Sequence, residues 1–394
     1  RQQRDRAIHL GARDVGSWRS HDPPAVLGVL DEGDVEGLVR SARQGLDAHR
    51  VEPGDRGTGK SGEKGRAAVH GPHGMPSDPH RLGSVPRADA ILPDLALSRS
   101  VLDRRGDLRA DPDLLPRLLA DETTRVLRVV GDLAPVEQGA DATRLVFSAP
   151  GPADLDRLAF DLGDAGGLAY VGVVADDLTA SVEGDDSWRT LRQVGASLAD
   201  LDAHALVTTV ALANWHRTHG HCPRCGTATV PALSGWIRRC PSDGSEHYPR
   251  TDMAVIMAVV DADDRLLLAR GRGFRGNGMS VLAGFVEPGE SLAAAVAREV
   301  LEEVGVAVTG VTYLGDQPWP FPSSLMLGFT SRALGTDLTL QAEEIEAARW
   351  FTRDELTAAL DDGSVVISGR LSISRRIIEH WFGGPLDSPE IPLR

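Results

Sequence analysis

The sequence has no long hydrophobic run. Its longest apolar stretches, such as MAVIMAVV at residues 253–260, fall far short of the roughly 20 residues that cross a bilayer. No basic segment followed by an apolar one opens the chain, so we expect no signal peptide and a cytoplasmic location. No membrane partner is therefore expected.

Positive charge is scarce as well. The chain has 42 Lys and Arg residues against 57 Asp and Glu residues, a net charge of -15. This balance argues against a broad, sequence-independent grip on nucleic-acid backbones, although it leaves room for a local basic site. With 41% hydrophobic residues in 394, the chain is long enough for two or three domains that each bury a core.

Cysteine is rare, and its three copies are clustered. Cys222, Cys225 and Cys240 lie within nineteen residues, which no even-numbered disulfide framework explains. A C-x-x-C pair followed by Gly directs two thiolates at one cation, and a second knuckle supplies the other ligands of a tetrahedral zinc. The fourth ligand stays open between Asp243, which has the expected spacing, and His247. We predict a structural zinc with Asp243 as that ligand; the alternative is a metal-free loop.

Aromatic residues are nearly absent from residues 1–88, which contain only Trp18 and are rich in Gly, Pro, Arg, Asp and His. Such a composition buries too little apolar surface to offset its ordering entropy, so we expect a disordered tail with one amphipathic helix candidate at 31–50. Strand and helix patterns follow. We divide the rest into an N-terminal α+β domain at 89–213, a zinc ribbon at 214–250 and a catalytic domain at 251–394.

The segment GFVEPGESLAAAVAREVLEEVGV, residues 284–306, combines an apolar helix pattern with five glutamates. A Pro-Gly pair stops any helix before Glu290, Ser291 is a good N-cap, and Gly305 ends the helix after Val304. Arg298 is expected to pair with Glu290 and to hold the preceding loop against the helix.

The glutamates of this helix continue its apolar stripe. At about 100° per residue, Leu292, Val296, Glu299 and Glu303 share one face, with Glu302 within a turn's width. Carboxylates that converge at a core edge take up protons unless a cation lies among them. Oxygen ligands without thiolate or imidazole select Mg²⁺ or Mn²⁺, and Mg²⁺ often shares its shell with substrate phosphates. The helix predicts metal-dependent phosphate chemistry.

From Gly284 to Val306 the segment resembles the Nudix box, G-x5-E-x7-R-E-U-x-E-E-x-G-U, at every defined position. GDQPWPFPSSLM, residues 315–326, is similar to the SQPWPFPxS signature of NADH pyrophosphatases of the NudC type, with Asp316 in place of the usual serine. The cysteine module just before the hydrolase domain is also typical of that subfamily. The resemblance covers about residues 89–385.

This resemblance implies an α/β fold: a Nudix α/β/α sandwich with a mixed sheet, preceded by a zinc ribbon and a smaller, divergent Nudix-like N-terminal domain. It implies homodimers that hydrolyse the pyrophosphate bond of NADH or NAD⁺ to AMP and the nicotinamide mononucleotide, with Mg²⁺ or Mn²⁺. One rival interpretation is the same enzyme acting on the 5′ end of NAD-capped RNA or on another dinucleotide such as ADP-ribose. The other is a Nudix ligand sensor without turnover, against which the complete set of box acids argues.

The resemblance also implies roles for individual residues. The metal ligands are Glu299, Glu303, Glu344 and the carbonyl of Ala283, and the catalytic residues are Glu302, Glu303 and Glu344. Glu343 and Glu346 compete with Glu344 for its role because the alignment of this loop can slip.

Recognition of adenine or nicotinamide needs flat surfaces and hydrogen-bonding groups. The residues that match nucleotide-binding positions are Tyr248, Phe285, Gln317, Trp319, Phe321 and Ser324. Three prolines predict that Trp319 and Phe321 lie on a rigid extended strip; the alternative is that both only pack against the sheet edge. Asp316 adds a negative charge there unless it faces a cation.

Overall fold

The chain divides into two units, residues 1–75 and 76–394. A computed structural model describes residues 91–92, 95–139, 143–175, 187–274, 276–387 and 390–391. The predicted tail and its helix candidate at 31–50 lie outside these residues. Within the described part, no helix combines the length and hydropathy needed to cross a bilayer.

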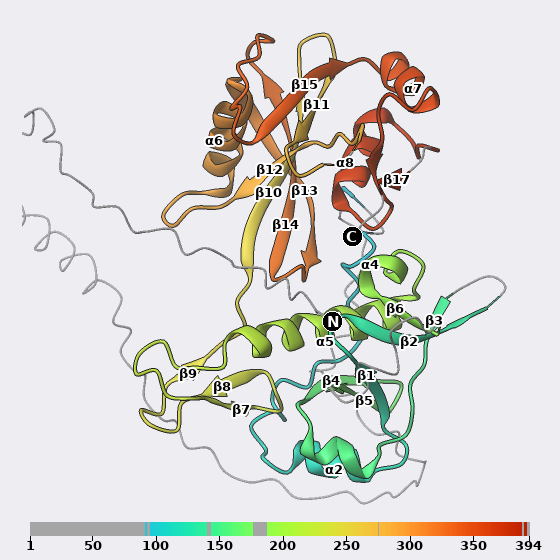
Figure 1. The fold of residues 1–394 in the computed structure, drawn as a ribbon, viewed down its shortest axis with the longest axis vertical. Helices are drawn as coiled ribbons and strands as arrows, with labels where there is room; N and C mark the ends of the chain where they lie inside the picture. Colours follow the sequence, from blue (N-terminus) through green and yellow to red (C-terminus); the bar gives the residue numbers. More distant parts are fainter. Residues whose placement is uncertain are drawn as a thin grey trace, which may run out of the picture. The chain divides into compact units, whose positions relative to one another are not determined.

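A mixed sheet is the centre of the C-terminal half (Figure 1). Its strands follow the order β13 (Val308–Trp319), β14 (Ser324–Ala333), β10 (Asp252–Val260), β11 (Leu266–Gly271) and β15 (Ile345–Phe351), and β12 (Leu282–Phe285) also pairs with β10. β10 and β14 are parallel, whereas the other pairs are antiparallel. The apolar segments on either side of the polar turn DADD, residues 261–264, predict a hairpin of buried strands, which is confirmed as β10–β11.

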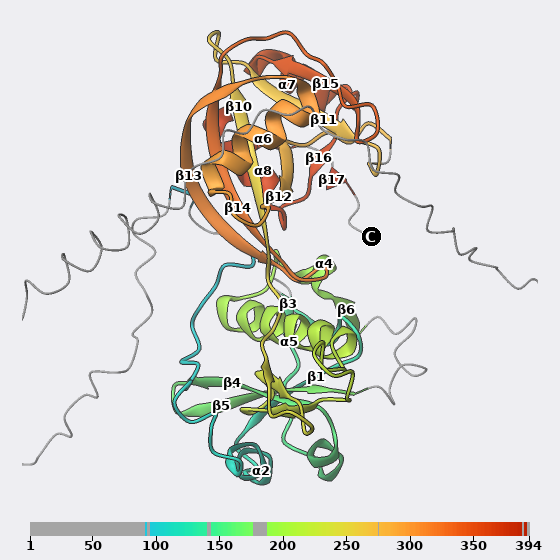
Figure 2. The same ribbon diagram turned by 90° about the vertical axis from the view of Figure 1, so that its left-hand side faces the viewer.

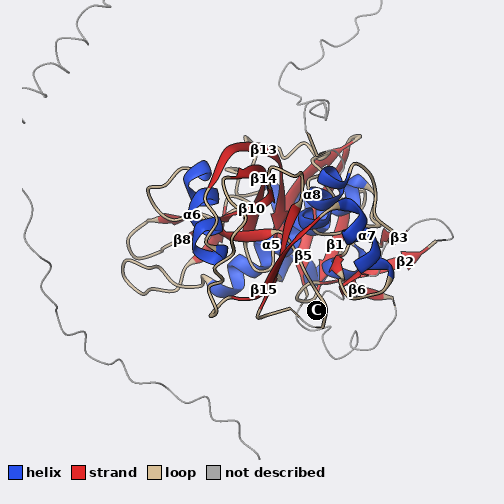
Figure 3. Cartoon of the chain, turned by 90° about the horizontal axis from the view of Figure 1, so that it is seen from above, coloured by secondary structure: helices blue, strands red, loops and turns tan. Residues whose placement is uncertain are grey.

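Helices cover both faces of this sheet (Figure 3). Alternate residues of β10 point to opposite faces. Val255 and Met257 share a core with α6 (Leu292–Val304), whereas Ile256 and Ala258 share a core with α7 (Arg353–Asp361) and α8 (Ile373–Phe382). The expected α/β/α sandwich is confirmed. A short parallel pair, β16 (Ile367–Ser368) and β17 (Glu390–Ile391), completes this half.

The region before the cysteines is α+β. One sheet has the order β1 (Arg125–Val129), β5 (Leu168–Val174), β4 (Ala159–Ala165), and another the order β3 (Thr143–Leu145), β2 (Leu133–Gln138), β6 (Trp188–Thr190). α5 (Asp200–Thr218) lies along one face of the first sheet and α2 (Leu114–Ala120) along the other (Figure 2). The short helices η2 (Pro152–Asp156) and α4 (Leu191–Val194) lie in connections. The expected likeness of this region to a Nudix domain, and the domain boundaries, stay predictions.

The sequence pattern of residues 186–219 predicts a helix, and this prediction is wrong at its start. Trp188–Thr190 is strand β6, not helix, because Thr190 is extended and caps α4 by accepting from the amide of Gln193. The helical pattern is broken again at Gly195, where a Cβ would lie 2.7 Å from Leu371 Cδ1. Only α4 and α5 of the predicted stretch are helical.

The cysteine region forms a small antiparallel sheet of β7 (Val230–Ala232), β8 (Ile237–Arg239) and β9 (Glu246–His247). Several hydrogen bonds attach it to the preceding region, among them two short ones. Trp236 Nε1 donates to Asp161 O at 2.7 Å, and His216 Nε2 lies 2.8 Å from Gly235 O.

Candidate functional site

The acidic helix α6 has the bounds that its sequence predicts. Ser291 is the N-cap and accepts from the Ala294 amide at 3.2 Å. Gly305 ends the helix with a left-handed φ of 74°, a conformation that glycine adopts at little cost. Local contacts therefore fix both ends of the helix.

Arg298 connects this loop to the helix. Its guanidinium lies 2.6 Å from Glu290 Oε1, which confirms the predicted pair, and it also donates to Phe285 O at 2.7 Å. The same group contacts Glu299 Oε1 at 2.7 Å and Glu302 Oε2 at 3.0 Å. These contacts raise the pKa of Arg298 above its usual range, with the hydrogen bond to Glu290 as the largest cause. Arg298 thus orients two of the box carboxylates as well as the loop.

Glu303 is the buried acid of the site. It is 7% exposed, and its Oε2 is buried without a hydrogen-bond partner. Burial raises the pKa of Glu303 to about 8, and the charges of Glu299, Glu344 and Glu302 add to this effect. An isolated buried carboxylate is costly unless a cation or donor compensates it. The ionised Glu303 carboxylate therefore needs a positive charge beside it to compensate its burial.

The Glu299 side chain lies against strand β12. A Cβ at Gly284 would lie 1.9 Å from Glu299 Cδ, so only glycine leaves room for this carboxylate. Gly284 follows Ala283 in β12, and Ala283 is opposite Ile256 of β10. Burial raises the pKa of Glu299, and Glu302 and Glu344 contribute to the rise.

Glu344 precedes β15 and is exposed. Its charge raises the pKa of both Glu299 and Glu303, whereas neither Glu343 nor Glu346 contributes to either shift. Its main chain is fixed, because the carbonyl accepts from Arg272 N at 2.9 Å. This electrostatic effect supports Glu344 over its two competitors, and its role stays a prediction.

The chemistry of these carboxylates suits a hard divalent cation, although among the described residues they do not form a group with ligand atoms within 4.8 Å of one another. Glu299, Glu303 and Glu344 are mutually repulsive, one of them has an unpartnered buried oxygen, and the donors are all oxygen. A cation would relieve the repulsion and the burial cost together.

The ribbon brings together a second set of possible ligands. One atom each of Cys222, Cys225, Cys240 and Asp243 lies within 4.8 Å of the others, and His247 is not part of this group. Cys225 Sγ and Cys240 Sγ are 3.5 Å apart. Hydrogen bonds from Ser245 hold the pKa of Asp243 well below its usual range. Three sulfur atoms and one carboxylate oxygen fit tetrahedral zinc.

Comparisons with known proteins match both of these regions of the chain. Residues 250–367 match the family model described as NUDIX domain, and residues 217–248 match the model described as NADH pyrophosphatase zinc ribbon domain. This chain contains a Nudix domain preceded by an NADH pyrophosphatase zinc ribbon domain. The ribbon match and the four-ligand group together support a structural zinc.

The chain is similar to a Mycobacterium tuberculosis H37Rv protein named NAD-capped RNA hydrolase NudC, with 44% identity over 202 residues, covering 48% of this chain and 64% of that protein. It is 39% identical to human NAD-capped RNA hydrolase NUDT12 over 196 residues, 47% of this chain and 42% of the human protein. The matches thus span less than two thirds of these relatives. A solved Nudix hydrolase from Nitrosomonas europaea is 23% identical, with a TM-score of 0.32, covering 42% of this chain and 94% of that one.

Two of the aromatic candidates for nucleotide binding are exposed. Phe285 is 59% exposed on β12, directly after the glycine that contacts Glu299, and Tyr248 is 66% exposed just before β10. The Tyr248 hydroxyl donates to Glu246 Oε2 at 3.0 Å. Large exposed aromatic surfaces are available for stacking on a flat ligand.

The remaining nucleotide-binding candidates lie at the β13–β14 hairpin of the Nudix domain. Trp319 ends β13 and pairs with Ser324, which begins β14. Trp319 and Phe321 are half-buried against the core of the N-terminal region, and the Arg192 guanidinium lies 3.9 Å from the Phe321 ring centroid. The hairpin tip also accepts a hydrogen bond at Pro320 O from Asn214 Nδ2 at 2.9 Å. This geometry favours the packing alternative for both aromatic residues, and no sequence signal pointed to Arg192.

Gln317 is placed differently from its prediction. It is completely buried, accepts from Leu97 N at 3.4 Å and donates from Nε2 to Leu371 O at 2.9 Å. Its amide is therefore occupied by the protein, and a hydrogen bond to substrate finds no support in this geometry. Asp316 faces the Tyr313 hydroxyl, which donates to its Oδ2, rather than a cation.

Proposed function

We propose that this chain hydrolyses the diphosphate bond of NADH or NAD⁺, releasing AMP and the nicotinamide mononucleotide. The observation that carries the proposal is the buried, unpartnered Glu303 carboxylate among Glu299, Glu302 and Glu344. Phosphoryl transfer needs charge neutralisation and an aligned nucleophile more than covalent catalysis. A cluster of acids that needs a cation to compensate its charge suits phosphoryl transfer.

The proposed Mg²⁺ or Mn²⁺ ligands are Glu299, Glu303, Glu344 and the carbonyl of Ala283. A divalent cation supplies neutralisation of the diphosphate charge and activation of water. Arg298 holds Glu299 and Glu302 in place through hydrogen bonds of 2.7 and 3.0 Å. Glu344, exposed and close enough to perturb both buried acids, is proposed to orient the attacking water and accept its proton.

The substrate surfaces in this proposal are Phe285 and Tyr248, whose exposed rings offer stacking partners for adenine or nicotinamide. Ser324 remains a proposed contact at the hairpin, where Trp319 and Phe321 pack against the core of the N-terminal region. The ribbon supplies a rigid support before the Nudix domain, with zinc proposed at Cys222, Cys225, Cys240 and Asp243. A homodimer and a cytoplasmic location also stay proposals.

A second candidate is removal of the NAD cap from RNA. The relatives from Mycobacterium tuberculosis and human are both named NAD-capped RNA hydrolases. A capped RNA end presents the same dinucleotide as free NAD⁺, so one acid cluster serves both reactions. The alternative of a ligand sensor has less support, since every box acid is present.

The test is product analysis of purified protein with NADH and, in parallel, with NAD-capped RNA, with Mg²⁺ or Mn²⁺ added or omitted. A chelator is avoided because it would also remove zinc from the ribbon. We expect metal-dependent release of AMP and reduced nicotinamide mononucleotide, lost in Glu344→Gln and retained in the matched controls Glu343→Gln and Glu346→Gln. Tight binding of NADH without any cleavage would favour the sensor and contradict the proposal.

A further inference from the structure

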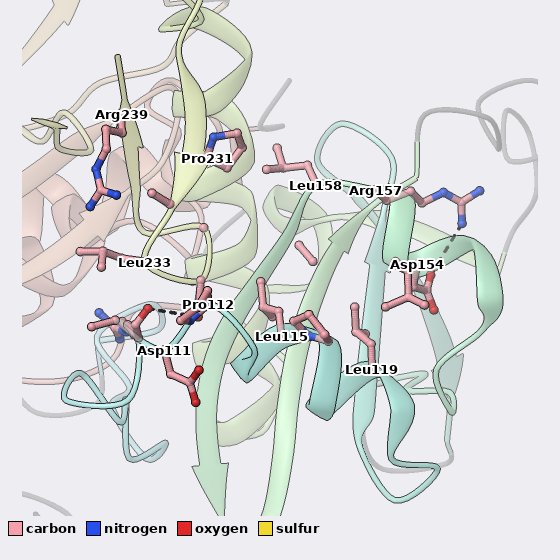
Figure 4. A pocket seen from close by; sticks show the side chains of 18 residues that line it. Asp111, Pro112, Leu115, Leu119, Asp154, Arg157, Leu158, Pro231, Leu233 and Arg239 are labelled. Carbon is pink, nitrogen blue, oxygen red and sulfur yellow. Dashed lines mark hydrogen bonds and ion pairs between the residues drawn. The ribbon is translucent and has the colours of Figure 1, made fainter. Parts of the chain in front are cut away.

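A cavity of about 420 Å³ lies where the N-terminal region meets the ribbon (Figure 4). α2 contributes Leu115 and Leu119 to one wall, the segment before β4 contributes Leu158, and the β7–β8 hairpin contributes Pro231 and Leu233. This volume is within the range of small-molecule sites, which often form between domains and are mainly apolar. None of the acids of the Nudix box lines it.

The ribbon wall of the cavity is held rigidly. Leu233 and Ser234 both have positive φ, 47° and 51°, which is unfavourable for residues other than glycine. The turn is fixed because Ser234 O accepts from Asp161 N at 3.1 Å and because a Cβ at Gly235 would lie 2.3 Å from Ala159 O. The fixed turn therefore holds the Leu233 side chain at the wall of the cavity.

Both carboxylates that line the cavity already have arginine partners. Asp111 pairs with Arg117 at 2.8 Å, and Asp154 accepts from Arg128 Nε at 3.0 Å and pairs with Arg157 at 3.7 Å. Of these three arginines, Arg157 alone lines the cavity. Among the described residues, neither acid forms an ion pair with the other two lining arginines, Arg109 and Arg239.

One lining arginine has no such partner. Arg239 pairs with Glu246 at 2.7 Å, but no carboxylate of the described residues forms an ion pair with Arg109. The Arg109 guanidinium lies 3.5 Å from the Trp236 ring centroid and donates to Arg104 O at 2.9 Å, and its Nε is buried without a hydrogen-bond partner. A positive charge without an ion-pair partner, at a cavity whose lining is part polar and part apolar, favours an anion.

The neighbours of Arg109 strengthen this imbalance. Burial lowers the pKa of Arg109 to about 10; Asp161 opposes this effect, whereas the charges of Arg104 and Arg105 add to it. Arg109 stays charged at neutral pH. Asp161, the nearest acid, is already paired with Arg105. Arg105 and Arg109 therefore share the charge of Asp161, and Arg105 is its ion-pair partner.

We propose that this cavity binds a small amphipathic anion, an aryl or alkyl body with one sulfonate, carboxylate or phosphate group. The body packs against the leucines of α2 and the ribbon, and the anionic group is attracted to Arg109. The site is independent of the proposed hydrolysis, so failure of either proposal leaves the other intact.

The test uses the fluorescent dye anilinonaphthalene sulfonate, titrated into wild-type protein and three variants of unchanged circular dichroism. Leu155 lines the cavity and is 57% exposed, so Leu155→Glu adds a negative charge at its mouth without disturbing a core. Leu155→Gln is the neutral control. Leu334→Glu places the same charge on a leucine that is 68% exposed and outside the cavity.

We expect saturable dye binding that Leu155→Glu weakens about ten-fold, or about 1.4 kcal/mol, while Leu155→Gln and Leu334→Glu stay within about two-fold of wild type. Equal affinity of Leu155→Glu and wild type would overturn the proposal, as would equal weakening by Leu155→Glu and Leu334→Glu. Absence of saturable binding to wild type, or equally tight binding of uncharged anilinonaphthalene, would overturn it too.

Discussion

Replacing Glu303 by Gln should make the metal-free protein more stable at high pH. The side chain is 7% exposed, and burial raises the pKa of its carboxyl from 4.5 to about 8. A carboxyl whose pKa is higher in the folded chain contributes stability that is complete below the unfolded pKa and is lost as the pH rises through the folded pKa. Glutamine resembles the protonated carboxyl and undergoes no such loss.

The size of the effect follows from the shift in pKa of Glu303. At about 1.36 kcal/mol per unit, a rise from 4.5 to about 8 sets an upper bound of roughly 5 kcal/mol. Relaxation and water penetration reduce the cost of burying a charge, so we expect about 1–3 kcal/mol. A change of this size is a large fraction of the stability of an ordinary domain.

The assay is urea unfolding at about pH 5.5 and pH 8.5, in buffer without Mg²⁺ or Mn²⁺ and without a chelator, so that the ribbon keeps its zinc. Wild type should lose stability between the two pH values, and Glu303→Gln should lose about 1–3 kcal/mol less. Glu302→Gln is the matched control, because its side chain on the same helix is 54% exposed, and it should follow wild type. Added Mg²⁺ should stabilise wild type at pH 8.5 more than Glu303→Gln. Parallel losses in wild type and Glu303→Gln would refute the reasoning.

Three further substitutions test separate parts of the site. Gly284→Ala places a Cβ 1.9 Å from Glu299 Cδ, so we expect at least about a ten-fold loss of turnover with the fold retained, measured by product release and circular dichroism. Asp243→Ala should lower the zinc content of purified protein and its melting temperature, whereas His247→Ala should change the zinc content little. Gln317→Leu leaves two buried main-chain groups unpaired, so it should cost about 1–3 kcal/mol in urea unfolding while KM for NADH stays near wild type.

Each of these predictions has a control or a contrary result. Gly273→Ala is the control for Gly284→Ala, because a Cβ at Gly273 meets no atom within 4 Å. Loss of zinc in His247→Ala but not in Asp243→Ala would reverse the assignment of the fourth ligand. A raised KM with unchanged stability in Gln317→Leu would show that the amide contacts substrate after all.

The acidic helix was predictable because its determinants are local. The cap at Ser291, the end at Gly305 and the pair between Arg298 and Glu290 all lie within a 16-residue span of sequence, and each has the predicted place in the structure. The choice of Glu344 over its neighbours has no such local determinants; it rests on the resemblance and stays a prediction. It depends on how the loop before β15 lies over α6, and there Gln341 N donates to Glu303 O at 3.0 Å, which brings the loop to the acids.

The ribbon was predictable for a similar reason. Metal ligands two or three residues apart on a tight turn converge whatever the rest of the fold does, so spacing alone identified Cys222, Cys225, Cys240 and Asp243. His247 was a competitor only in sequence. In the structure its Nε2 lies 3.1 Å from Ser245 Oγ, and it does not join the four-ligand group.

The signature around Gln317 shows where such reasoning fails. A polar side chain between aromatic residues and prolines suggests a ligand contact when it is read along the chain. The partners that occupy it are Leu97 and Leu371, which lie 220 residues before it and 54 residues after it. Burying a side-chain amide costs free energy unless its oxygen and its nitrogen are both hydrogen-bonded. The two distant partners therefore stabilise Gln317 in its buried position. Together with the Arg192 guanidinium over Phe321, this makes the β13–β14 hairpin the attachment of the Nudix sheet to the N-terminal region. The acids of α6 and the polar side chain of the signature therefore differ in kind. The acids repel one another and need a cation to compensate their charge, whereas the buried amide of Gln317 already has hydrogen-bond partners within the protein.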